Sequence, residues 1–155
     1  MIPKKEVLIR RTEKAIDGAQ ENMRIFTPWG ELTQWVFRYS GLFTQALKRG
    51  VTIRWITDTP RNSNSCPEAL LFLLREATFK LRVTPNPYKE RFGIFDNKEL
   101  FIATLIKPNA WDSPVLWTSN STIMHILEDY FEMKWKLAKE YKPERQITTE
   151  NGKCG

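Results

Sequence analysis

The chain has 155 residues, of which 41% are hydrophobic and 27% are charged, and its formal net charge at pH 7 is +6. This length and composition are typical of one globular domain with an apolar core, and they exclude a chain that is disordered throughout. No apolar run could span a bilayer and the first residues lack the apolar core of a signal peptide, so we expect a cytoplasmic protein without membrane contact.

We expect residues 1–142 to form a single domain and the polar segment 143–155 to be a disordered tail. One histidine and two cysteines are too few for a zinc site, and we predict neither a metal nor a cofactor. The excess positive charge is confined to residues 1–82, which contain 14 Lys or Arg against 8 Asp or Glu, whereas residues 83–155 contain 10 of each. Such a bias suits phosphate-bearing partners, and it also serves solubility.

Helices and strands alternate in the first half of the chain. Helical spacing of apolar residues and β-branched runs, bounded by Pro28 and Gly50, give the predicted elements. In order, these are a helix over 7–20, a strand over 23–28, a helix over 31–50, a strand over 51–58, a helix over 68–77 and a strand over 79–85.

The second half begins with strands and ends with a helix. Residues 91–96 and 98–105 read as a hairpin that turns at Asp96-Asn97-Lys98, and 114–119 reads as a further strand. The last helix is expected to be capped by Ser121 or Thr122 and to bury an apolar stripe. The predicted stripe consists of Ile123, Ile126, Leu127, Tyr130, Phe131 and Trp135.

This order of elements predicts an α/β fold: a single mixed, mostly parallel sheet with helices on both faces. Trp55, Trp117 and Trp135 lie on apolar patterns and are assigned to the core.

The stretch ERFGIFDNKELFIATL, residues 90–105, resembles a motif of the phospholipase D superfamily, His-x-Lys-x4-Asp followed by Gly-Ser-x-Asn. Counting back from Asp96 places Lys89 at the histidine position and Arg91 at the lysine position. Thr104 stands where the family has its serine. The framework therefore resembles the family, while the catalytic histidine is missing.

The resemblance extends over about residues 7–140. Segments such as KRGVTIRWITD and DYFEMKWKLA are similar in order and spacing to the phospholipase D-like effector domains of TrmB-type transcription regulators, which also lack the histidine. No winged-helix segment precedes residue 7 and no sugar-binding sandwich follows, so we expect an effector domain alone, as a fragment or a free-standing paralogue. Members of the superfamily build a site from two motif copies, so the resemblance implies a homodimer.

In the active superfamily a histidine attacks phosphorus, and neither lysine nor arginine replaces it near neutral pH because both are protonated. We therefore predict that the chain is not an enzyme. His125 is the only other imidazole, and its place on the terminal helix favours a structural role.

Binding is what this framework can retain. Lys89 and Arg91 alternate along the chain, so both would point to one side of a strand and could bind a small anionic ligand. Alternatively, Arg91 pairs with Asp96 or another acid, and Asp96 accepts backbone N–H bonds at the turn. Ser119 and Asn120 either line the same cleft or cap the last helix.

Further residues follow the first two strands, where ligands collect in open α/β sheets. Trp29, Asp58 and Arg61 are therefore candidates for a pocket wall, although a tryptophan also serves core packing.

The leading hypothesis is a non-catalytic sensor or dimerisation domain of a TrmB-type regulator, which binds a small anionic or sugar ligand and contacts DNA only weakly or through a separate domain. The alternatives are a phosphodiesterase or nuclease with a degenerate motif, and a basic nucleic-acid-binding module.

Overall fold

The computed structural model describes residues 5–60, 66–85, 91–104 and 110–143. Four helices and seven strands are found in these ranges. The helices are α1 (Lys5–Gly18), α2 (Trp29–Lys48), α3 (Glu68–Leu74) and α4 (Ser121–Leu137). The strands are β1 (Asn22–Phe26), β2 (Thr52–Asp58), β3 (Phe79–Thr84), β4 (Phe92–Phe95), β5 (Glu99–Ala103), β6 (Val115–Thr118) and β7 (Lys139–Glu140), and a 3-10 turn spans Ala110–Asp112.

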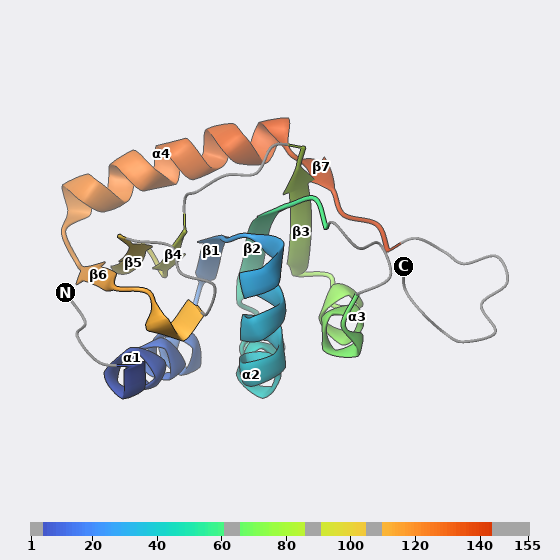
Figure 1. The fold of residues 1–155 in the computed structure, drawn as a ribbon, viewed down its shortest axis with the longest axis horizontal. Coiled ribbons are helices and arrows are strands. Elements are labelled where there is room, and N and C mark those ends of the chain that lie inside the picture. The colour runs from blue at the N-terminus through green and yellow to red at the C-terminus, as the bar shows by residue number, and fades with distance from the viewer. Residues whose placement is uncertain (1–4, 61–65, 86–90, 105–109, 144–155) are drawn as a thin grey trace, which may run out of the picture.

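One sheet holds all seven described strands in the order β6-β5-β4-β1-β2-β3-β7. In Figure 1, α1, α2 and α3 lie on one face of this sheet and α4 crosses the other. The predicted single mixed sheet with helices on both faces is confirmed. Parallel pairing joins β1 to β2 and β2 to β3. The other four described pairings are antiparallel.

Every predicted helix and strand is found in the described residues, with ends that differ by at most three residues. Two of these elements end near the residue that was expected to stop them. Pro28 follows β1, and Gly50 follows α2 with a φ of 92°. The hairpin also turns where expected, with Asp96 and Asn97 in the left-handed region at φ 57° and 54°. Short polar side chains tolerate that region better than branched ones. The two-residue strand β7 was not predicted, because so short an element carries no periodicity.

The core is split by the sheet into two apolar clusters. The cluster under α1, α2 and α3 includes the fully buried Trp55, as predicted. The cluster under α4 joins Phe131 and the buried Trp135 to residues of the strands. Trp117 differs from the prediction, because it is only half-buried and lies at the rim of the first cluster.

The cap of α4 is Asn120, whose side chain accepts a hydrogen bond of 3.0 Å from the backbone N–H of Ile123, so the alternative that Asn120 caps this helix is confirmed. Ser121 and Thr122, the other candidates for the cap, lie inside the helix. Ile123 and Ile126 were expected in the core but are 38% and 63% exposed.

Three arginines attach α4 to the sheet. Arg24 of β1 and Arg54 of β2 occupy paired positions and both bind Glu132 of α4, with Arg24 Nε at 3.0 Å and Arg54 Nη1 at 2.9 Å from its carboxylate. Arg82 of β3 donates to the carbonyl of Trp135 at 2.7 Å and lies over its ring. The hydrogen bond from Arg54 is the main cause that lowers the pKa of Glu132.

Candidate functional site

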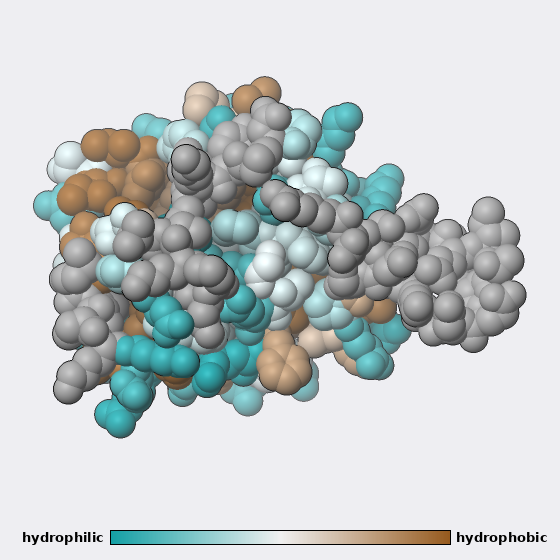
Figure 2. Space-filling view, viewed as in Figure 1, coloured by the Kyte–Doolittle hydropathy of each residue, from teal (hydrophilic) through white to brown (hydrophobic). Residues whose placement is uncertain are grey.

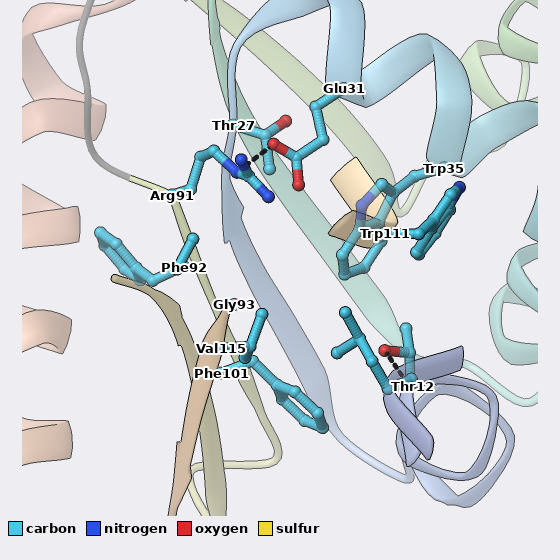
Figure 3. A pocket seen from close by; sticks show the side chains of 12 residues that line it. Thr12, Thr27, Glu31, Trp35, Arg91, Phe92, Gly93, Phe101, Trp111 and Val115 are labelled. Atoms are coloured by element: carbon cyan, nitrogen blue, oxygen red, sulfur yellow. Dashed lines mark hydrogen bonds and ion pairs between the residues drawn. The ribbon is translucent and has the colours of Figure 1, made fainter. Parts of the chain in front are cut away.

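Arg91, the counterpart of the motif lysine, is buried against α2. It lies directly before β4, at the edge of the sheet where β1 and β2 end, which we call the carboxyl edge. Its guanidinium forms an ion pair with Glu31 in the first turn of α2 and donates to Ser113 Oγ at 2.8 Å. Figure 3 shows the Arg91 and Glu31 side chains pointing toward one another. Their exposed fractions are 4% and 8%, so this cation is turned into the protein.

Burial sets the electrostatics of this pair. It raises the pKa of Glu31 from 4.5 to about 7, and the charge of Arg91 opposes that rise without cancelling it. Burial likewise lowers the pKa of Arg91, against the opposing effect of Glu31. Desolvation penalises both charged forms, so Glu31 gains and loses its proton near neutral pH.

Next to this pair lies a cavity of about 30 Å³ lined mainly by apolar side chains, among them Trp35, Phe101 and Trp111. A water needs about 10–15 Å³ of such volume, so the cavity has room for two or three waters. A ligand the size of a phosphate ester or a sugar would have to displace Glu31 or a neighbouring ring.

The predicted pocket-wall residues have structural partners. Asp58 Oδ1 accepts a hydrogen bond of 2.7 Å from the backbone N–H of Trp29, and so binds one of the free N–H groups at the start of α2. The Trp29 ring packs against Tyr141, with centroids 5.5 Å apart. Thr104 lies at the same edge, where its N–H and hydroxyl both donate to the carbonyl of Pro114. Lys89 and Arg61 lie outside the described residues.

The other predicted site residues lie at the opposite edge of the sheet, where β1 begins. Asp96 accepts three backbone N–H bonds, from Gln20 at 2.8 Å, Glu21 at 2.7 Å and Asn22 at 3.1 Å. Ser119 and Asn120 follow the end of β6, whose Thr118 pairs with Leu100 near the hairpin turn. The expectation that Ser119 and Asn120 share a cleft with Arg91 is therefore wrong, because β6 begins at the carboxyl edge and ends away from it.

His125 does not lie near Arg91, so it cannot supply the imidazole that the motif region lacks. It is exposed on α4, and α4 packs on the Phe92 side of the sheet. Arg91 precedes Phe92 and meets α2 on the other face. Among the described residues no group of three His, Cys, Asp or Glu side chains could hold a metal ion, and no helix is both long and apolar enough to cross a bilayer.

Glu31 and Ser113 were not predicted as site residues. Glu31 is 60 positions from Arg91 in the sequence and reads only as an acid in a first helical turn. Ser113 lies in a short segment with no periodicity. The expectation that Arg91 pairs with an acid could be stated from sequence, but its partner depends on how α2 sits on the sheet.

A basic groove was also missed. It has a volume of about 620 Å³ and lies between α1 and the β4–β5 hairpin. Four of its cations are Arg10, Arg11, Lys14 and Lys98, and the Arg11 guanidinium lies 4.8 Å from the centroid of the Trp117 ring. The Trp117 indole donates to Glu99 at 2.9 Å. The cations of this groove form no continuous basic segment in the sequence, because α1 and the β4–β5 hairpin, which lie far apart in the chain, both contribute them.

No family profile matches the chain, and no curated protein matches its sequence. Solved structures do match, and they define a phospholipase D-like fold. Nuc, a phospholipase D family member from Salmonella typhimurium, is 15% identical with a TM-score of 0.61, over 86% of this chain and 90% of that one. NucT from Helicobacter pylori is 15% identical with a TM-score of 0.68, over 88% and 92%.

The archaeal chromatin protein TrmBL2 has the same fold. It is 14% identical with a TM-score of 0.69, over 89% of this chain and 52% of TrmBL2, so this chain spans about half of that protein's length. Its structure is described as showing a novel mode of DNA binding. Identities this low show a shared fold, and the predicted resemblance to phospholipase D-like and TrmB-type proteins is confirmed at that level.

Proposed function

We propose that this chain is a non-catalytic phospholipase D-like sensor and dimerisation domain of a TrmB-type transcription regulator. The observation that carries the proposal is the buried Arg91–Glu31–Ser113 cluster at the place of the motif lysine. A catalytic cation has to face the phosphoryl oxygens of its substrate. Here the cation faces a carboxylate of its own chain, and the histidine position holds a lysine.

The likeness to TrmBL2 supports the regulatory part of this proposal, because this chain matches about half of a DNA-binding chromatin protein. In the proposal, DNA contact comes mainly from a separate domain. The ligand class that fits the Arg91 edge is a small anion, which would compete with Glu31 for the guanidinium and favour the protonated Glu31.

Hydrolysis of a chromogenic phosphodiester and of plasmid DNA tests the non-catalytic statement. We expect no turnover above the background of an Arg91→Ala variant purified in the same way. Lys80→Ala, an exposed lysine on β3, serves as the matched control. Turnover that is lost in both Lys89→Ala and Arg91→Ala but kept in Lys80→Ala would show an enzyme. Circular dichroism verifies that each variant is folded.

A second function, direct binding of nucleic acid, is supported by the basic groove. In this proposal backbone phosphates bind the cations of the groove, and an unstacked base stacks with the half-buried Trp117 ring and the Arg11 guanidinium that lies over it, as in proteins that bind single strands. A triple change of Arg10, Arg11 and Lys14 to alanine should weaken binding and lower the salt dependence, by about one unit of slope for each lost phosphate contact. A control that removes three exposed charges elsewhere, at Lys48, Arg75 and Lys80, should keep the slope. Equal slopes for the two triple variants would remove the groove as the site.

A further inference from the structure

Helix α4 carries a second apolar stripe, beside the one that packs on the sheet. Its exposed residues are Ile123, Ile126, Met133 and Leu137, and Tyr130 lies at its border, because the Tyr130 ring also packs against Phe26 and Phe92 of the sheet. The exposed fractions are 38% at Ile123, 63% at Ile126, 51% at Met133 and 71% at Leu137, and Tyr130 is half-buried. Figure 2 shows hydrophobic residues gathered over the left half of α4. Four of the seven large hydrophobic side chains that are exposed in the described residues belong to this one stripe.

The spacing of the stripe is that of a helix-pairing seam. The four exposed members are three, seven and four positions apart, so they occupy the a and d positions of one heptad frame, with the half-buried Tyr130 on the a position between Ile126 and Met133. The buried stripe of the same helix, with Met124, Phe131 and Trp135, already attaches α4 to the sheet. The exposed members of the outer stripe are therefore not needed for the fold of the monomer, and an exposed apolar stripe of this length is typical of an interaction site.

The charges along α4 favour pairing in the antiparallel sense. Asp129 and Lys136 are exposed beside the stripe, whereas Glu128 and Glu132 are paired with arginines of the sheet. Parallel helices would place Asp129 near the half-buried Lys134, whose amine already lies over Tyr130, whereas antiparallel helices place Asp129 of one copy beside the exposed Lys136 of the other. The helix dipoles also oppose each other favourably in that arrangement.

The register can be worked out from the heptad positions. In an antiparallel pair with Ile126 opposite Leu137 of the other copy, Tyr130 lies opposite Met133. The exposed Asp129 and Lys136 are one heptad apart on the same side of the stripe, so each faces the other residue across the seam. This pairing is repeated by the twofold axis, as an isologous interface requires.

We propose that α4 pairs antiparallel with α4 of a second copy of this chain, through the outer stripe and two Asp129–Lys136 contacts. The inference deepens the dimerisation part of the proposed function and rests on it. A second copy is the occupant because the stripe and its flanking charges are complementary to themselves. Since α4 covers the face of the sheet opposite α2, this dimer leaves the Arg91–Glu31 edge uncovered.

Light scattering coupled to gel filtration, with the full chain at high micromolar concentration, tests the interface. We expect the mass of a dimer for the wild type and of a monomer for Ile126→Glu and for Leu137→Glu, which change exposed side chains and should leave the fold intact. The matched control is Phe37→Glu, at an 85% exposed phenylalanine on α2, which should remain a dimer.

Charge reversal tests the antiparallel register. Asp129→Lys and Lys136→Glu should each lower the dimer fraction severalfold at low salt, and the double variant should restore it. A parallel pair would place Asp129 near Lys134, so Lys136→Glu would have no effect. That result would overturn the register.

A monomeric wild type at every concentration would overturn the proposal together with the dimerisation part of the proposed function. A dimer that persists in both Ile126→Glu and Leu137→Glu would overturn the α4 surface and leave dimerisation standing. Neither result bears on the statement that the chain is non-catalytic, which the hydrolysis assay decides separately.

Discussion

Replacing Glu31 by glutamine should change how the stability of the protein depends on pH. Glu31 titrates with a pKa of about 7 when folded, because burial disfavours its charge more than Arg91 favours it. In the unfolded chain the pKa is the ordinary 4.5. A group whose pKa is raised by folding contributes stability that is complete below its unfolded pKa and is lost as the pH rises through its folded pKa.

The size of this effect follows from the two pKa values. The separation between 4.5 and about 7 is about 2.5 pH units, which corresponds to about 3 kcal/mol at 1.36 kcal/mol per unit. Wild-type stability should therefore fall by about this amount, from this residue alone, between pH 4.5 and pH 8. Glutamine resembles protonated Glu31 in shape and charge and does not titrate, so Glu31→Gln lacks the loss.

Urea denaturation at a series of pH values from 4.5 to 8 measures the difference in unfolding free energy between wild type and variant. Taking the difference cancels the titration of every other group that behaves alike in the two proteins. We expect the variant to gain about 3 kcal/mol on the wild type across this range. A difference that stays constant with pH would mean that Glu31 keeps an ordinary pKa. The Arg91–Glu31 pair would then be a fully ionised bridge, and the reasoning from burial would fail.

Three further changes test other parts of the fold. Asp96→Ala leaves three backbone N–H groups without their acceptor and places alanine at a positive φ, so thermal and urea unfolding should show a loss of about 3 kcal/mol. Glu132→Ala removes two ion pairs that are partly exposed, so the loss in urea should be about 1 kcal/mol. This loss should shrink as acid protonates Glu132, at a pH below the ordinary pKa of a glutamate because the pKa of Glu132 is lowered. Asn120→Ala removes the cap of α4 and should cost about 1 kcal/mol, with Ser119→Ala as the neutral neighbour in the same measurement.

The helices and strands could be predicted from the sequence because their signals are local. Apolar spacing, β-branched runs and the punctuating Pro28 and Gly50 act within a few residues of each element. The antiparallel share of the sheet was underestimated, because strand direction after the first βαβ units depends on short loops whose geometry has no periodic signature. The outer position of Ile126 was missed for a related reason, since a helix with two apolar stripes gives one broad pattern in sequence.

The candidate site could be predicted only in part. Counting along the motif identified Arg91, and the possibility that it pairs with an acid followed from its charge. Which acid it meets depends on the placement of α2, and that is fixed by packing between residues far apart in the chain. Counting along the chain also grouped Asn120 with Arg91, whereas the direction of β6 separates them by the length of a strand, about 10–13 Å for four residues.

Three described polar residues near the two ends of the strands share one property that bears on function, because each bonds to its own chain. Arg91 meets Glu31 and Ser113, Asp96 holds the start of β1, and Asp58 holds the start of α2. A catalytic site needs such groups aimed at the space that a substrate occupies, and desolvated groups are costly unless they are paired. Here each of these groups is paired with another group of its own chain. The pairs fix neighbouring segments at the two ends of the strands, so these residues stabilise the fold. The exposed outer stripe of α4 and the basic groove beside α1 are the surfaces on which we propose that partners bind.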